Sequence, residues 1–486
     1  MKRWIKAVLI IVSVISFIIP PFCSFAIVRE GEGEAALLQE GEFDVVDGES
    51  VKHFANNAKS SSAEEFLYNQ LLSFPESIDL SAYRVSADTF SAFYSNVIND
   101  NPDLFYVSSS YQYNYYPSNN TVANVYPEYS MTSEEIEQAK IIFNKGRDKA
   151  LSRIDSSMTD VQKAVVLHDY VCSLAHYPNV DLNTEDKGIY HSAYGLFYDG
   201  EVVCAGYTLA YSYLMNLAGV QCEYVSSDPM NHAWNKAFID GSWYNIDCTF
   251  DDVDFDSSIS LIGSEGHMHF LKSDSKFTTQ ECSFHYGGET LDDCTADSTL
   301  YDNAFWNDIY SNIYAVDGEF YYLKPDYTNR KVTFTKRTVS GAETDLSVFS
   351  NSISFSGSST VFDSNGNQYT NTHRDALARL TYLDSRFYMN VGKTIYSYCL
   401  PSRRYNIVGI SQYSMGLGVD DKYNLIYQHY DTPDTLRKID KTEYYNNYFT
   451  TVKSQNYNNY PDININGVIN AKDYAMIRAQ NKYPPA

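Results

Sequence analysis

Three residues that together can carry out acyl transfer lie within residues 203–252 of the 486-residue chain. Cys204 offers a sulfur nucleophile, His232 an imidazole that can take up and return a proton, and Asp247 a carboxylate that can orient that imidazole. Each of these residue types is more often structural than catalytic when it occurs alone. Their occurrence together, in segments whose predicted geometry brings them close, predicts one thiol-dependent site.

Cys204 stands at the start of a predicted helix that Gly219 is placed to end. At a helix N-terminus, unpaired backbone N–H groups and the positive end of the helix dipole favour the nucleophilic thiolate form of cysteine. The same N–H groups can also stabilise an oxyanion. The apolar residues that recur at helical spacing are Leu209, Tyr213, Leu214 and Leu217.

His232 and Asp247 lie on a predicted β-hairpin. Residues 232–239 and 242–250 each have the composition of a strand, and Asp240-Gly241 between them is typical of a tight turn. A two-residue turn places Trp234 opposite Asp247 and His232 opposite Thr249, so that His232 and Asp247 project from the same face. Such diagonal neighbours are roughly 7–8 Å apart at the backbone, within reach of an imidazole–carboxylate hydrogen bond. A three-residue turn would instead place His232 and Asp247 on opposite faces of the hairpin.

Around these residues the sequence resembles the transglutaminase-like superfamily, in its bacterial secreted branch. The matching stretches are VCAGY at 203–207, the LAYSYLMNLAGVQCEYV that follows, NHAWNKAFIDGSWYNIDCTFDD at 231–252 and HFLKSD at 269–274, in order and spacing from 159 to 277. The resemblance implies an α+β fold with a papain-like core over residues 131–277. It also implies that Cys204 is the nucleophile, His232 the general base and acid, and Asp247 its orienting partner. No upstream glutamine or tryptophan can be assigned as a side-chain oxyanion donor.

The resemblance implies attack on a peptide or amide carbonyl to give a thioester on cysteine, with no cofactor for catalysis. Water would resolve the thioester in a peptidase or amidase, and a lysine amine would resolve it in a crosslinking transglutaminase. The sequence leaves these alternatives open, with hydrolysis slightly favoured by the bacterial relatives. A further alternative is a non-catalytic extracellular adhesion protein or carbohydrate-binding scaffold component.

The N-terminal residues predict export. Residues 1–26 combine basic Lys2, Arg3 and Lys6 with an apolar run and a small-residue cleavage pattern, as a secretory signal peptide does. No later stretch is long and apolar enough to predict a membrane span, although an uncleaved anchor at the N-terminus stays open. Residues 27–63 are rich in Glu, Gly and Ser, which predicts an acidic, mobile leader. We therefore expect a secreted protein, with association to a cell surface or scaffold left open.

The remaining domains are predicted from local patterns. Residues 64–130 predict a small α+β module. Thr132 with Glu135, and Thr159 with Gln162, form capping boxes that open two helices leading into the core. The second helix carries His168 and Asp169, for which a packing role is favoured. Residues 300–452 alternate aromatic and β-branched residues between turn signals, which predicts a β-rich domain with a loose, propeller-like recurrence.

Residues 459–486 carry a calcium-loop pattern. Oxygen-bearing side chains occupy loop positions 1, 3, 5, 9 and 12, a glycine occupies position 6, and a carbonyl can serve at position 7. The segment resembles one repeat of a dockerin, the module that docks secreted enzymes onto cohesin-bearing scaffolds such as cellulosomes. It implies a structural Ca²⁺ and a possible cohesin-bearing partner, although only one repeat is recognised. The predicted ligands are Asp462, Asn464, Asn466, Val468 through its carbonyl, Asn470 and Asp473.

The net charge and the cysteine and histidine content bear on possible partners, disulfide bonds and metal sites. The formal net charge of −25 argues against nucleic acid as a partner, because phosphates favour a basic surface. Setting aside Cys23 and Cys204, six cysteines remain, and fifteen pairings are open to them. Cys282 and Cys294 are close enough in sequence to form a bridge, with buried thiols equally expected. His267 and His269 alone do not predict a zinc site.

Overall fold

The computed structural model describes residues 34–37, 62–180, 182, 187–252, 261–290, 294–383, 385–400, 403–410, 413–420 and 424–439. The predicted signal peptide at 1–26 and the predicted calcium loop at 459–486, with ligands from Asp462 to Asp473, lie outside these residues. No described helix has the length and apolar character that a membrane span requires.

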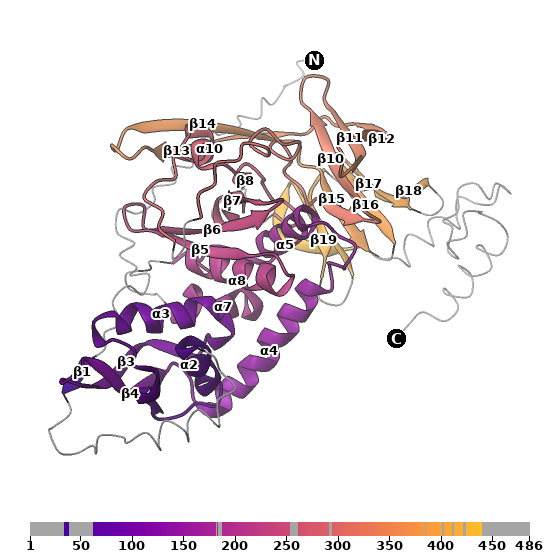
Figure 1. Cartoon of the computed structure of the whole chain (residues 1–486). Coiled ribbons are helices and arrows are strands. Elements are labelled where there is room, and N and C mark those ends of the chain that lie inside the picture. The colour runs from indigo at the N-terminus through magenta and orange to yellow at the C-terminus, as the bar shows by residue number, and fades with distance from the viewer. Residues whose placement is uncertain are drawn as a thin grey trace, which may run out of the picture.

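An N-terminal module packs two helices against a small sheet, as the sequence predicts for residues 64–130 (Figure 1). Its sheet has the strand order β1-β3-β4-β2, and β1 pairs in parallel with β3. The sequence did not predict β1, which lies within the segment expected to be a mobile leader. The elements are β1 (Glu34–Leu37), α2 (Ala63–Leu71), β2 (Ile78–Asp79), α3 (Phe90–Asp100), β3 (Val107–Tyr116) and β4 (Thr121–Tyr129).

Of the four longer helices of the central domain, one packs against its sheet and the other three pack on that helix (Figure 1). Both predicted capping boxes are present. The side chains of Thr132 and Thr159 each accept the backbone N–H of the residue three positions later, and their own backbone N–H groups donate to the side-chain oxygen of that residue. The predicted helix that opens at Cys204 is also confirmed, and Gly219 follows it with φ of +81°. These helices are α4 (Ser133–Leu151), α5 (Asp160–Leu174), α7 (Ala193–Tyr198) and α8 (Cys204–Leu217).

The central sheet has the order β5-β6-β7-β8 and contains the predicted hairpin. The two-residue turn is confirmed, because Ile239 pairs with Ser242 and Asn235 pairs with Ile246. Asp240 and Gly241 both have positive φ, the backbone that a tight hairpin turn of this twist requires. The strands are β5 (Cys222–Ser227), β6 (His232–Ile239), β7 (Ser242–Ile246) and β8 (Phe270–Lys272).

The prediction of a strand through residue 250 is wrong beyond Ile246. Asp247 instead caps a short helix, α9 (Cys248–Asp251), by accepting the backbone N–H groups of Thr249 and Phe250. The predicted pairing of His232 with Thr249 is therefore wrong, and His232 pairs with Ser227 of β5. Capping by an aspartate ends the strand because its side chain supplies the acceptor that the first helical N–H groups need.

The C-terminal part is formed by antiparallel sheets, as the sequence predicts. Two sheets are four-stranded meanders, with the orders β9-β10-β11-β12 and β15-β16-β17-β18, and smaller sheets pair β13 with β14 and join β19 to β21. A short helix, α10 (Asp274–Phe277), precedes them. The strands are β9 (Tyr314–Val316), β10 (Glu319–Asp326), β11 (Lys331–Thr338), β12 (Glu343–Ser350), β13 (Phe355–Phe362), β14 (Gln368–Asp375), β15 (Arg379–Leu383), β16 (Arg386–Val391), β17 (Thr394–Cys399), β18 (Arg404–Ile410), β19 (Ser414–Val419), β20 (Leu425–His429) and β21 (Thr432–Lys438).

The first β-rich sheet shares a hydrophobic core with the central helices. Trp306, Ile313, Phe320 and Tyr322 belong to the same buried cluster as side chains of α5 and α8. Trp306 is almost fully buried, and its indole N–H donates to the carbonyl oxygen of Phe270 in β8. The two regions therefore stabilise each other through common apolar burial.

We predict that Trp306→Ala destabilises the central domain and the adjoining sheet together. Removing a buried tryptophan from a shared core costs about 3–5 kcal/mol of unfolding free energy. Denaturant unfolding followed by circular dichroism measures the loss. Trp243→Ala is the matched control, because Trp243 is only partly buried, on β7, and should cost clearly less. Equal losses in the two variants would contradict a shared core.

Candidate active site

Cys204 lies at the first residue of α8 with its thiol partly exposed. The preceding Val203 provides no side-chain cap, and its carbonyl oxygen accepts the backbone N–H groups of Gly206 and Tyr207. Gly206 allows this turn to pack closely, because a Cβ there would lie 2.7 Å from the carbonyl oxygen of Tyr190. The other described cysteines are all buried. Among the cysteines that the structure describes, Cys204 is therefore the one that a substrate can approach.

His232 and Asp247 meet directly. Nε2 of His232 lies 2.7 Å from Oδ2 of Asp247, and the His232 ring interacts electrostatically with the side chain of Cys204. Because Nε2 faces the carboxylate, Nδ1 is left for the sulfur. The imidazole is 8% exposed and the carboxylate 1% exposed, so both interactions form away from bulk water. The structure therefore brings all three sequence-predicted catalytic residues together.

Asp247 is held by four donors. Its Oδ1 accepts the backbone N–H groups of Thr249 at 2.9 Å and Phe250 at 3.2 Å. Its Oδ2 accepts His232 and also His285, whose Nε2 lies 2.8 Å away. Its own backbone N–H donates to the carbonyl oxygen of His269. A buried carboxylate with this many donors is fixed in position and kept ionised.

His285 was missed by the sequence reasoning. It follows β8 in a loop, lies 38 residues from Asp247 in sequence, and belongs to no spacing pattern that marks a catalytic residue. The loop turns sharply at Ser283 and Phe284, which both have positive φ, and returns the histidine to the carboxylate. In the sequence, the only feature that could have indicated His285 is its position shortly after the HFLKSD stretch at 269–274.

The electrostatics favour a protonated His232 beside an ionised Asp247. Burial acts to lower the pKa of His232, but the charge of Asp247 and hydrogen bonds to Asp247 and Cys204 outweigh it and raise this pKa to about 10. Burial acts to raise the pKa of Asp247, and the two histidines reverse this and hold it well below its usual range. An imidazolium next to a cysteine sulfur favours the thiolate.

His285 faces an acceptor with each of its two ring nitrogens. Burial lowers the pKa of His285 to about 4, whereas Asp247 acts to raise it. Its Nδ1 lies 2.7 Å from the carbonyl oxygen of Cys282, so the doubly protonated ring would satisfy both neighbours. Burial has the larger effect on the pKa of His285, because the charge of His232 already offsets that of Asp247.

Aromatic rings enclose the imidazole–carboxylate group. The ring centroid of Phe250 lies 4.8 Å from that of His232, and those of Trp234 and Phe277 lie 5.1 Å and 3.9 Å from that of His285. These apolar neighbours exclude water from Asp247, which strengthens its hydrogen bonds.

The sequence also made predictions for two residues of α5, for a disulfide bond and for a calcium loop. His168 and Asp169 of α5 are buried, as a packing role requires, and contact each other through Nδ1 and Oδ1 at 3.0 Å. The thiol of Cys282 is free and donates to the carbonyl oxygen of Met268, so the bridge to Cys294 is not formed. The calcium-ligand prediction lies outside the described residues.

Two comparisons with known proteins found matches. Residues 148–248 match the family model of the transglutaminase-like superfamily. A solved structure described as "Crystal structure of a TGase" also matches, at 14% sequence identity over 26% of this chain and 41% of that chain, with a TM-score of 0.20. The chain thus spans less than half of that structure, and the assignment rests on the family match. No curated protein matches the chain. The chain therefore contains a transglutaminase-like domain at residues 148–248.

We predict that the stability contributed by His232 falls at alkaline pH. The folded-state pKa of His232, about 10, exceeds the unfolded value of about 6.5. Its protonated form therefore stabilises the fold fully below about pH 6.5, and this contribution disappears as the pH rises through about 10. Between about pH 7 and about pH 10, wild type should lose more unfolding free energy than His232→Gln in denaturant titrations. His176→Gln, on a partly exposed histidine outside the site, should follow wild type.

We predict that His285→Gln slows alkylation of Cys204 about 10- to 100-fold near neutral pH, because Asp247 loses one of its charge-assisted hydrogen bonds. The rate constant for iodoacetamide labelling, followed by mass spectrometry, measures this effect. His373→Gln, on a histidine of β14, is the control. An unchanged rate in His285→Gln would show that His232 and the backbone suffice to hold Asp247.

Proposed function

We propose that this chain is a thiol-dependent acyl-transfer enzyme that attacks a peptide or amide carbonyl and forms a thioester on Cys204. The observation that carries the proposal is the contact of His232 with both Cys204 and Asp247, at the start of a helix. A nucleophile, a proton carrier and an orienting carboxylate in this order form the minimal apparatus for such a reaction.

Each residue has one part in the reaction. The Cys204 sulfur forms a bond to the carbonyl carbon, whose oxygen takes the negative charge of the tetrahedral intermediate. The His232 imidazolium then gives its proton to the nitrogen of the departing amine, and the C–N bond breaks. Asp247 keeps the ring oriented throughout and stabilises its charge.

Two sources of oxyanion stabilisation lie beside the sulfur. The first-turn N–H groups of α8 are not claimed by a side-chain cap at Val203. Tyr224 of β5 lies close enough to Cys204 for the two groups to interact electrostatically. Burial and that interaction raise the pKa of Tyr224, so its hydroxyl keeps its proton and can donate.

The second half of the reaction determines the class of enzyme. In a peptidase or amidase, His232 takes a proton from water, which attacks the thioester and releases an acid. In a crosslinking transglutaminase, a lysine amine attacks instead and an isopeptide bond forms. We place hydrolysis first, and both outcomes use the same three residues.

The proposed setting is extracellular. Supporting it are the signal-peptide pattern of residues 1–26 and the dockerin-like pattern of residues 459–486, which would bind Ca²⁺ and a cohesin-bearing scaffold. The predicted substrate is a protein or peptide, and nucleic acid is not expected as a partner.

We predict that limiting iodoacetamide alkylates Cys204 selectively near neutral pH, because Cys204 is the only described cysteine that is not buried. Limiting iodoacetamide from about pH 4 to about pH 9, with peptide mapping of the full chain, measures this. His232→Gln should lower the labelling rate near neutral pH about 100-fold, because the thiolate loses its imidazolium partner. Cys222→Ala, which removes a buried thiol of β5, should label like wild type.

Labelling of Cys204 that rises only near about pH 8.5 and is unchanged in His232→Gln would contradict an assembled site. The non-catalytic adhesion or carbohydrate-binding alternative would then be favoured. With glutamine-containing peptides, ammonia release without amine incorporation identifies a hydrolase. Incorporation of a primary amine identifies a transferase, and Cys204→Ala should abolish either product.

A further inference from the structure

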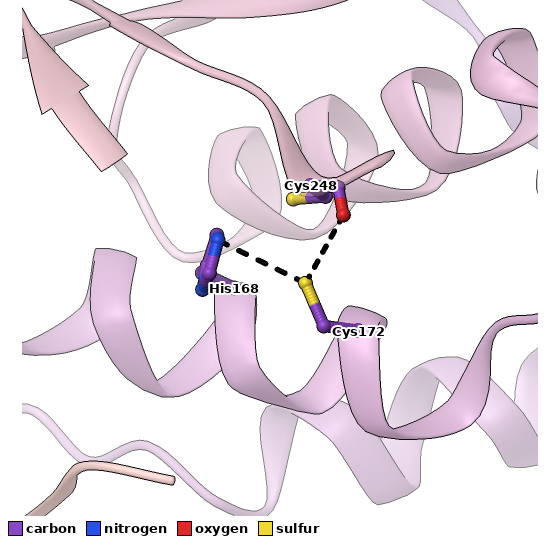
Figure 2. A group of neighbouring side chains, drawn as sticks. All are labelled: His168, Cys172 and Cys248. Atoms are coloured by element: carbon purple, nitrogen blue, oxygen red, sulfur yellow. Dashed lines mark hydrogen bonds between the residues drawn. The ribbon is translucent and has the colours of Figure 1, made fainter. Parts of the chain in front are cut away.

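A second group of reactive side chains lies behind the candidate active site. His168 and Cys172 are one helical turn apart on α5, and Cys248 is the first residue of α9 (Figure 2). Their possible ligand atoms all lie within 4.8 Å of one another. All three residues are at most 3% exposed. The acyl-transfer chemistry proposed above uses none of them.

We propose that His168, Cys172 and Cys248 form a structural site for a divalent metal ion of zinc type, with Asp251 as the fourth donor. Imidazole and thiolate are ligands that Zn²⁺ prefers, and structural zinc sites are commonly four-coordinate and closed to solvent. Binding releases the two thiol protons, so that two thiolates and a carboxylate face the ion.

Two separations within this group are close to the edges of a tetrahedral zinc site. With zinc–sulfur and zinc–nitrogen bonds of about 2.3 Å and 2.0–2.1 Å, a nitrogen–sulfur edge of the tetrahedron measures about 3.6 Å. Nε2 of His168 lies 3.8 Å from Sγ of Cys172. The same nitrogen lies 3.3 Å from Oδ2 of Asp251, close to a nitrogen–oxygen edge of about 3.4 Å. Modest side-chain rotation would complete the coordination.

His168 is oriented as a metal-binding histidine usually is. Its Nδ1 lies 3.0 Å from Oδ1 of Asp169, which fixes the N–H on that side and leaves the lone pair of Nε2 facing the sulfurs. Asp169 is itself held by Nε2 of His267 at 2.9 Å and the backbone N–H of Ile313 at 2.6 Å. A carboxylate behind the ligating imidazole is the support that metal sites commonly contain.

Asp251 is positioned from the other side. Its carboxylate accepts the backbone N–H of His269 and contacts Nδ1 of that ring at 3.0 Å. Oδ2 of the same carboxylate lies 3.3 Å from Nε2 of His168, so the carboxylate is within reach of an ion bound by that nitrogen.

The proposed metal site would help to hold the carboxylate of Asp247 in position. Cys248 directly follows Asp247, and Asp251 ends the same four-residue helix, whereas His168 and Cys172 belong to α5. A metal ion would therefore tie α9 to α5 at the residues next to the proposed triad. Because a buried site of this kind assembles on folding, the ion would contribute to folding stability.

The test measures metal in the full-length protein after expression and refolding with Zn²⁺. Elemental analysis should find one tightly held zinc per chain, and denaturation should release it together with two newly reactive thiols. Cys172→Ala/Cys248→Ala should hold none. Cys222→Ala, a buried cysteine of the same core, and Cys204→Ala should retain it, which separates this site from the catalytic thiol.

Co²⁺ substitution gives a second readout. Thiolate-to-cobalt charge-transfer absorption should appear in wild type and in Cys204→Ala, and should be absent from His168→Gln and the double variant. If those variants fail to fold, the wild-type stoichiometry and spectrum still decide the matter. Wild type without bound zinc, whose two thiols react as soon as the chain unfolds, would overturn the proposal, as would a disulfide between Cys172 and Cys248 found by peptide mapping.

Discussion

The ionised carboxylate of Asp247 is the constraint on which the site depends. A buried anion is tolerated only when donors replace its lost hydration, and Asp247 has two backbone N–H groups and two imidazoles in that role. This requirement explains why β7 stops at Ile246 and a helix begins immediately after Asp247. It also explains why a distant loop returns to place His285 against the carboxylate. Without these donors, the carboxylate would take up a proton and could not hold His232 protonated.

The central sheet and helices place Cys204 against this anchored pair. Helix α8, whose first residue is Cys204, packs across β5 and β6, and His232 is the first residue of β6 (Figure 1). The nucleophile therefore sits on a helix end and the base on a strand end, both rigid supports. Rigid placement matters because proton transfer between sulfur and nitrogen needs hydrogen-bond contact. The enclosing aromatic rings keep this contact in an apolar environment.

The β-rich part of the chain contributes to the same assembly through packing. Trp306 and Ile313 belong to the core of the central domain, and the backbone N–H of Ile313 holds Asp169 behind His168. Buried polar groups on α5, α9 and the first β-rich sheet are thus linked across the domain boundary. This linkage gives the C-terminal sheets a supporting role near the site, whatever surface functions they have.

The sequence by itself determined the elements that depend on neighbouring residues. The capping boxes at Thr132 and Thr159, the helix that opens at Cys204 and the hairpin register set by Asp240-Gly241 all follow from local hydrogen bonding and turn geometry. Only the tertiary structure decided that α9 replaces the end of a predicted strand. It also decided that His285 completes the Asp247 site from 38 residues away and that Cys172 meets Cys248 across 76 residues. Such contacts arise from how separate elements pack, and no local periodicity records them.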